Sequence, residues 1–298
     1  MARGSAGESA LHRHLRVLDT FDTLHPFRTL GQIAEAADLA PSTTHRLVAE
    51  LTAEGLLERL PDRTYRLGIR LWEYASRTPG ALGLREVARP WLQAAHVRIR
   101  QHIQLGVLAG TDVLFVERLS ARNAVVNATL IGGRIPLHAS ASGLVLLAYA
   151  EPAVLEAVLA TDLRSYTAAT IRTATELHRT LRRVRAEGYA DLRGHIHEDA
   201  RGLGVPVRGP DGSVYAALSA VIRNTDGPAY DVIETLRVAA SGVARSLADT
   251  YARGTDSWHG PGPDAGVAAA SWEYIAALAR ATKHPIGDEI GVNPAPRV

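Results

Sequence analysis

The chain of 298 residues has the length of about two globular domains. Hydrophobic residues make up 46% and charged residues 21%, which is ordinary for a soluble protein with packed cores. No apolar run approaches the ~20 residues that a membrane-spanning helix needs, and no secretory signal pattern is visible. The absence of cysteine excludes disulfides, thiolate metal sites and cysteine nucleophiles. We therefore expect a cytoplasmic protein with two domains and no membrane partner.

The charge of the chain does not by itself indicate a nucleic-acid partner. The formal net charge is only +2, because 33 basic residues face 31 acidic ones. Lys283 is the single lysine, so that almost all basic residues are arginines. This bias is typical of a GC-rich genome, and a surface that coats RNA or DNA is the less favoured interpretation.

The first 80 residues carry the pattern of three helices followed by a β-hairpin. Apolar residues recur at helical spacing, and two short strand-like runs flank a Pro-Asp-Arg turn. The expected elements are a helix over 11–21, a short helix after Thr29, a helix capped by Ser42 and ended by Gly55, strands at 56–60 and 64–67, and a helix over 68–78. Pro79-Gly80 breaks the pattern, and we place a domain boundary there.

The second part of the chain alternates between strand-like and helix-like runs. The expected helices cover about 84–101, 144–150, 176–187 and 230–253, and the expected strands cover 103–109, 112–119, 125–131, 205–208 and 213–223. Strands joined by hairpins and mixed with helices favour an α+β fold over a doubly wound parallel sheet. From Gly254 the sequence is rich in glycine and proline, with a flexible linker at 260–263 and one further helix expected at 265–281.

The first segment has the layout of a winged helix-turn-helix, in which the second helix of the pair enters the major groove of DNA. The residues that begin this helix offer hydroxyl, imidazole and guanidinium groups, and the wing adds two arginines. The candidate DNA-binding residues are Arg28, Ser42, Thr43, Thr44, His45, Arg46, Arg63, Tyr65 and Arg66. Residues 1–78 hold as many acidic residues as arginines, so the charge of this segment does not by itself favour DNA binding. The competing interpretations are that Ser42, Thr43 and Thr44 simply cap the helix, or that the segment is a protein-interaction module.

A single winged helix reads only a short half-site, and specificity usually needs two half-sites. We therefore expect a homodimer on a pseudo-palindromic operator in double-stranded DNA. The apolar faces of 11–21 and 69–74 are the candidate dimer surface, with Trp72 and Tyr74 as aromatic anchors.

Several short motifs, in order and well spaced, resemble the IclR family of bacterial transcriptional regulators. In the first segment they are Thr29-Leu30-Gly31-Gln32-Ile33-Ala34, the run Leu39 to Leu47, Glu54-Gly55-Leu56-Leu57 and Tyr65-Arg66-Leu67-Gly68. In the second they are Pro136-Leu137-His138-Ala139-Ser140-Ala141-Ser142-Gly143, Glu187-Gly188-Tyr189, Pro206-Val207, Asp211-Gly212 and Ala216-Ala217-Leu218-Ser219. The resemblance covers the chain from about Leu11 to Arg253 and leaves the tail without a counterpart.

The resemblance implies a definite architecture and role. It implies a winged helix-turn-helix domain over 1–67, a linker helix over 68–83, a GAF-like α/β effector-binding domain over 84–253 and a C-terminal extension over 254–298. It also implies dimers through the DNA-binding domains, often tetramers, and control of a catabolic operon by a small metabolite, usually an organic or aromatic acid. A repressor is the favoured form.

The segment 138–143 is the candidate effector site, because small residues let backbone N–H groups at a helix start approach an anion. The N–H groups of Ser142 and Gly143 and the hydroxyls of Ser140, Ser142 and Ser219 are the expected donors. Correspondence to the family adds Leu192 and the segment 202–204, and an apolar wall completes the site. The candidate effector-binding residues are Leu130, His138, Ser140, Ser142, Gly143, Leu144, Leu192, Gly202, Leu203 and Ser219. The competing interpretation is that Ser142 simply caps the helix.

Two positions depart from the family pattern and favour an apolar ligand. The helix after the loop commonly begins Gly-Lys but reads Gly143-Leu144 here, and Leu192 stands where a polar pocket residue is expected. An aromatic or otherwise apolar carboxylic acid, or a related carbonyl compound, therefore fits better than a two-carbon acid.

Enzyme and metal chemistry find little support in the sequence. His195 and His197 could share one face of a strand and bind a metal, but no third ligand has a characteristic spacing, and a polar loop over the pocket is favoured. The segment 139–143 lacks the first glycine of a nucleophile elbow, and Gly202-Leu203-Gly204 lacks the third glycine of a dinucleotide loop. We expect no enzyme, metal or cofactor; a hydrolase or sensor enzyme with an accessory helix-turn-helix is the alternative.

Overall fold

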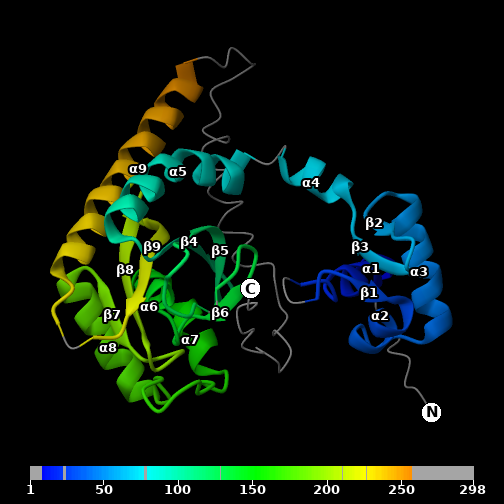
Figure 1. Ribbon diagram of the computed structural model, residues 1–298, viewed down its shortest axis with the longest axis horizontal. Helices are drawn as coiled ribbons and strands as arrows, with labels where there is room; N and C mark the ends of the chain where they lie inside the picture. Colours follow the sequence, from blue (N-terminus) through cyan, green and yellow to red (C-terminus); the bar gives the residue numbers. More distant parts are fainter. Residues whose placement is uncertain are drawn as a thin grey trace. The chain divides into compact units, whose positions relative to one another are not determined.

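The computed structural model describes residues 9–22, 25–76, 79–127, 129–209, 211–225 and 227–256. The chain divides into two units between Pro79 and Gly80, and each is described by itself (Figure 1). The expected linker at 260–263 and helix at 265–281 lie outside the described residues. The last helix runs to Asp256, past the expected end of the effector domain at 253.

The N-terminal unit is a winged helix-turn-helix, as the sequence predicts. Its helices are α1 (Ala10–Leu18), α2 (Leu30–Ala36), α3 (Pro41–Ala53) and α4 (Ile69–Ser76). Its strands are β1 (Arg28–Thr29), β2 (Leu57–Arg59) and β3 (Thr64–Leu67), which form an antiparallel sheet in the order β1-β3-β2. Strand β1 has no counterpart in the sequence prediction, and α1 ends three residues earlier than expected.

The helix-turn-helix pair is held by a small apolar core and by its turn. Val17, Ile33, Leu47 and other apolar side chains of the three helices are fully buried together. The turn between α2 and α3 places Asp38 in the left-handed region, with φ of 50°. The guanidinium of Arg16 donates to the carbonyl oxygens of Ala37 and Asp38, so that α1 fixes this turn.

The start of α3 differs from the prediction. Ser42 does not cap the helix; Ala40 occupies the N-cap position, and Pro41 is the first helical residue. Proline suits that position because its missing N–H would have no helical partner and its φ is already helical. Ser42 therefore lies within the first turn, on the exposed side of the helix.

The C-terminal unit is built on a six-stranded antiparallel sheet in the order β6-β5-β4-β9-β8-β7. The strands are β4 (His102–Ala109), β5 (Asp112–Leu119), β6 (Arg134–Pro136), β7 (Ala190–Arg193), β8 (Ala200–Arg208) and β9 (Val214–Arg223). The central strands β4, β9 and β8 are buried on both faces, because helices cover the sheet from both sides (Figure 1).

The helices form one layer on each face of the sheet. Helices α5 (Pro79–Ile99) and α9 (Tyr230–Asp256) share a core with one face, and α6 (Ala141–Tyr149), α7 (Pro152–Leu159) and α8 (Ala174–Glu187) share a core with the other. Strand β8 shows the division, since Leu203 and Val205 face α5 and α9 while Gly202 and Gly204 face α6. Between α5 and α9, the indole of Trp91 packs on Gly242 and donates to Ser246 Oγ at 3.0 Å.

Residues 125–127 and 129–131 are not in a strand but in irregular structure, so the strand predicted there is wrong. Side chains replace the backbone ladder that a strand would need: Val125 N donates to Gln101 Oε1 at 3.0 Å, and a ring nitrogen of His102 lies 2.5 Å from Val125 O. The guanidinium of Arg118 donates to the carbonyl of Thr129. The apolar run at 125–131 therefore reflects a packed loop rather than a strand.

The remaining differences concern element bounds. Helix α6 begins at Ala141 rather than 144, α5 begins at Pro79 rather than 84, and β8 begins at Ala200 rather than 205. Helix α7 and strands β6 and β7 were not predicted. Within the described part of the chain, no helix is both long enough and apolar enough to cross a membrane.

Candidate functional site

The exposed face of α3 carries most of the predicted DNA-binding residues. Ser42, His45 and Arg46 are exposed and Thr43 is half-buried. Thr44 is fully buried, and its hydroxyl donates to the carbonyl of Ala40 at 3.2 Å. Thr44 therefore supports the fold of the helix-turn-helix and does not belong to the exposed face of α3.

Arg46 lies in a small network of charged side chains on the exposed surface. Its Nη1 is 2.6 Å from Glu50 Oε1, one turn further along α3, and His14 Nε2 from α1 is 2.7 Å from Glu50 Oε2. The bonds from His14 and Arg46 hold the pKa of Glu50 below its usual value. A DNA phosphate or base that binds the Arg46 guanidinium must therefore compete with the Glu50 carboxylate.

The wing turns tightly through a left-handed residue. Arg63, with φ of 66°, is exposed at the tip, and the Asp62 carboxylate accepts from the backbone N–H and hydroxyl of Thr64 at 3.0 and 2.6 Å. Arg66 pairs with Glu58 at 2.8 Å.

Two further candidates of the DNA-binding set are already engaged within the protein. Tyr65 is half-buried beneath the guanidinium of Arg59, which lies 6.0 Å from its ring. Arg28, also half-buried, donates from Nε to the carbonyl of Thr20 at 2.6 Å. Arg63 is thus the wing arginine best placed to reach a DNA backbone.

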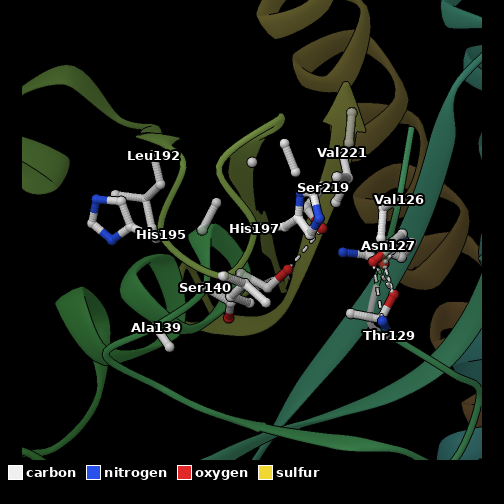
Figure 2. A pocket seen from close by; sticks show the side chains of 17 residues that line it. Val126, Asn127, Thr129, Ala139, Ser140, Leu192, His195, His197, Ser219 and Val221 are labelled. Carbon is white, nitrogen blue, oxygen red and sulfur yellow. Dashed lines mark hydrogen bonds between the residues drawn. The ribbon is translucent and has the colours of Figure 1, made fainter. Parts of the chain in front are cut away.

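A cavity of about 50 Å³ opens in the C-terminal unit where α6 begins (Figure 2). Its walls come from the start of α6, from strands β4, β7, β8 and β9, from the loop residues Val126, Asn127 and Thr129, and from the loop 194–199. Five of the predicted effector-binding residues line it: Ser140, Ser142, Leu192, Gly202 and Ser219. Figure 2 shows Leu192 and His195 on one side of Ser219, and Asn127 and Thr129 on the other.

The other five predicted effector-binding residues do not line the cavity. Gly143 is one of them, and its contacts explain its position. Its N–H donates to Ser140 Oγ at 3.0 Å, so that it is the helix cap rather than a ligand that uses this group. A Cβ at Gly143 would lie 2.2 Å from the carbonyl oxygen of Leu137, so the glycine serves the close approach of two backbones. The N–H group of Gly143, which we expected to face a ligand, is therefore already used within the helix cap. The capping residue is Ser140 rather than Ser142.

The remaining four are placed by packing. Leu144 is fully buried in the core beneath α6, and Leu203 points to the opposite face of β8 from Gly202. A ring nitrogen of buried His138 lies 3.0 Å from the carbonyl of Arg164. Leu130 is half-buried in the loop beyond the lining residue Thr129.

Two hydrogen-bonded groups provide the polar lining of the cavity. The hydroxyl of Ser142 donates to Ser219 Oγ at 2.7 Å, and both residues are buried. Thr129 donates to Gln104 Oε1, to which Asn127 also donates at 3.2 Å. The sequence analysis missed Gln104 and the loop residues. A signal was available for Gln104, which interrupts the apolar run from Ile103 to Ala109.

The loop 194–199 contributes the imidazoles of His195 and His197 to the lining. His197 Nδ1 accepts from the backbone N–H of Asp199 at 3.2 Å. Burial, together with nearby Arg183, lowers the pKa of His195 to about 4, so this side chain is neutral at pH 7. Among the described residues, no arginine or lysine lines the cavity. In the same part of the chain, no three histidine, aspartate or glutamate side chains lie close enough together to hold a metal ion.

A winged helix-turn-helix unit followed by a second unit with a partly polar cavity is the layout of a ligand-controlled transcriptional regulator. Residues 10–61 match the IclR helix-turn-helix domain, and residues 78–245 match the C-terminal domain of the IclR bacterial transcriptional regulators. The chain therefore belongs to the IclR family of bacterial transcriptional regulators.

Individual relatives agree with this assignment. The HTH-type transcriptional regulator XynR of Escherichia coli K12 is 30% identical over 243 residues, which cover 80% of this chain and 96% of the relative. An IclR homolog from Microbacterium hydrocarbonoxydans, solved in complex with 4-hydroxybenzoate, is 43% identical with a TM-score of 0.77, over 81% of this chain and all of that one. A second homolog, from Microbacterium sp. strain HM58-2, is 42% identical with a TM-score of 0.54, over 81% and 98%. The match to both domains of a family of transcriptional regulators supports a regulator rather than the alternative of a hydrolase or sensor enzyme.

Proposed function

We propose that the chain is a repressor of a catabolic operon, that α3 reads its operator, and that a small aromatic carboxylic acid in the cavity controls it. The observation that carries the effector class is the cavity lining, which combines apolar walls with uncharged hydrogen-bonding groups. The complex of the Microbacterium hydrocarbonoxydans homolog with 4-hydroxybenzoate supports the same class.

The chemistry of the lining fits a flat ring with polar ends. Val126, Leu192 and Ile196 offer apolar surface to the ring faces. The hydroxyls of Ser142 and Ser219 and the polar group around Gln104 can pair with the oxygen atoms of the acid. Such pairing is required, because a carboxylate taken from water without hydrogen bonds costs several kcal/mol.

The size of the cavity suggests how a ligand would act. A cavity of about 50 Å³ is smaller than the ~150 Å³ that holds benzene in a protein interior, so an aromatic acid must displace part of the lining. A ligand shifts a conformational equilibrium only by its difference in affinity for the two states, and such a displacement provides that difference.

Operator binding by the full-length chain, measured by fluorescence anisotropy on the DNA upstream of its own gene, tests the proposal. We expect 4-hydroxybenzoate, but not acetate, to change the affinity. Ser142→Val should bind DNA normally and lose the response, whereas Ser241→Val, on the exposed face of α9, should keep it. Arg46→Ala should weaken DNA binding by about 1–3 kcal/mol while calorimetry finds acid binding unchanged.

The effector site, the DNA contact and the sign of regulation can each be contradicted by a separate result. A normal response of Ser142→Val, or a response to acetate alone, would place the effector elsewhere. Unchanged affinity of Arg46→Ala would remove this residue from the interface. Transcription in vitro decides the sign of regulation, since a repressor lowers the yield from its own promoter and an activator raises it.

A further inference from the structure

A second cavity lies on the other side of the wall formed by Leu192 and His195. It has a volume of about 200 Å³ and is bounded by α8, by the loop 168–172 that precedes it, and by this wall. Leu192 and His195 line both cavities, whereas Ser142, Ser219 and Gln104 line only the first. The two spaces are therefore neighbours with different chemistry.

The lining of the second cavity is basic because of the helical spacing in α8. Glu176, Arg179, Thr180 and Arg183 recur at three and four residues and so share one face of the helix, and all four line the cavity. A different face of the helix carries Leu177, Leu181 and Val184, which are buried in the core. This periodicity keeps two guanidinium groups and a hydroxyl directed at the same space.

The positive charge of this cavity is not neutralised internally. Arg172 joins Arg179 and Arg183 in the lining, against one carboxylate, that of Glu176. The Glu176 carboxylate accepts from the backbone N–H of Arg172 at 3.3 Å and so is engaged at the start of α8. Among the described residues, no carboxylate lies within ion-pair distance of the Arg183 guanidinium.

His195 leaves a polar atom unsatisfied in the shared wall. Its Nδ1 is buried and has no hydrogen-bond partner among the described residues. Its backbone is firmly held, because Thr170 Oγ1 donates to the His195 carbonyl at 2.6 Å and Thr167 Oγ1 donates to the Gly194 carbonyl at 2.6 Å. A buried polar group without a partner is unfavourable, and a bound ligand atom that pairs with it removes this cost.

We propose that this second cavity binds a small oxyanion, the phosphate or carboxylate group of a metabolite, through Arg179, Arg183 and the His195 ring. Guanidinium groups bind such oxygens through charged, often paired hydrogen bonds, and Thr180 adds a hydroxyl. Because Leu192 and His195 belong to both walls, the anion and the aromatic effector influence each other's affinity by the same factor. The site itself does not depend on the proposed effector.

The test is calorimetry on the full chain at fixed ionic strength, with inorganic phosphate in one arm and malonate in the other. We expect saturable binding of one equivalent per chain in at least one arm, and the arm that binds more tightly identifies the class of anion. The double variant R179Q/R183Q should bind this anion at least tenfold more weakly. Arg182→Gln removes one positive charge, half of the change in the double variant, from an exposed position of α8 outside the cavity, and it should leave binding unchanged.

Two results would overturn the proposal. One is the absence of saturable binding of both anions to the unmodified chain. The other is an equal loss in Arg182→Gln, which would mean that general charge and not the cavity attracts the anion. The arginines of the double variant are exposed, and an unchanged melting temperature confirms that it folds. Failure of the 4-hydroxybenzoate response leaves this result intact, so the two proposals fail separately.

Discussion

The histidines of the C-terminal unit differ in their surroundings, and this sets the pH at which each accepts a proton. Buried His102 lies within hydrogen-bond distance of Ser120 Oγ and the Val125 carbonyl, and burial lowers its pKa. Burial also lowers the pKa of His138, and it lowers that of His195 further, to about 4. His178, in contrast, is exposed on α8. The buried imidazoles are therefore neutral at pH 7, and protonating them favours unfolding.

Acid should destabilise the protein partly through His195. Its pKa is about 6.5 in the unfolded chain and about 4 in the folded one, so the unfolded state binds more protons between these values. The free energy of unfolding therefore falls as the pH drops from about 6.5 to about 4. Urea unfolding across this range should show a shallower fall for His195→Gln and an unchanged one for His178→Gln. Equal slopes for both variants and the unmodified chain would contradict the buried, neutral state of His195.

The elements that the sequence predicted well are those whose pattern is local. Helix α8 alternates apolar and charged residues at helical spacing, and its predicted and observed ends agree within two residues. The start of α6 was missed because residues 139–143 are all small and carry no period. The loop 125–131 was misread because its bonding comes from distant side chains such as His102 and Arg118. These contacts have no signature in the loop itself.

The close packing at the start of α6 predicts opposite effects for two Gly→Ala changes in helices. At Gly143 a Cβ would lie 2.2 Å from the carbonyl oxygen of Leu137, and backbone cannot give way easily. We expect Gly143→Ala to lower the free energy of unfolding by about 1–3 kcal/mol. At Gly83, within α5, no described atom lies within 4 Å of the added Cβ, so Gly83→Ala should raise it by about 0.5–1 kcal/mol. Urea titration measures both, and a stabilised Gly143→Ala would refute the close approach.

For the whole molecule, the order of the units was predictable and the composition of the ligand cavity was not. Consecutive motifs along the chain identify a winged helix-turn-helix followed by a mixed α/β unit, because each motif shapes its own segment. The cavity instead assembles Gln104, Asn127, Ser142, His195 and Ser219 from five separate segments. Sheet pairing sets Gln104 beside Ser219, and the packing of α6 and the loops on the sheet adds the other three residues. That pairing is a property of the complete fold.

The exposed apolar surface of the N-terminal unit predicts that the protein functions as a dimer. In α4, Ile69 is 70% and Trp72 64% exposed, and α1 exposes Leu11 and Leu15, which is costly for a monomer in water. Aromatic side chains are frequent anchors of interfaces. We expect sedimentation equilibrium to find a dimer at micromolar concentration and Trp72→Ala to weaken it at least tenfold.

Phe27 offers a matched control, because it is an exposed aromatic residue of the same unit outside α1 and α4. Phe27→Ala should leave both self-association and operator binding unchanged. Trp72→Ala should also lose most of its preference for two half-sites over one, since a monomer contacts a single half-site. If the unmodified chain sediments as a monomer both with and without operator DNA, the exposed face of α4 is not a dimer interface.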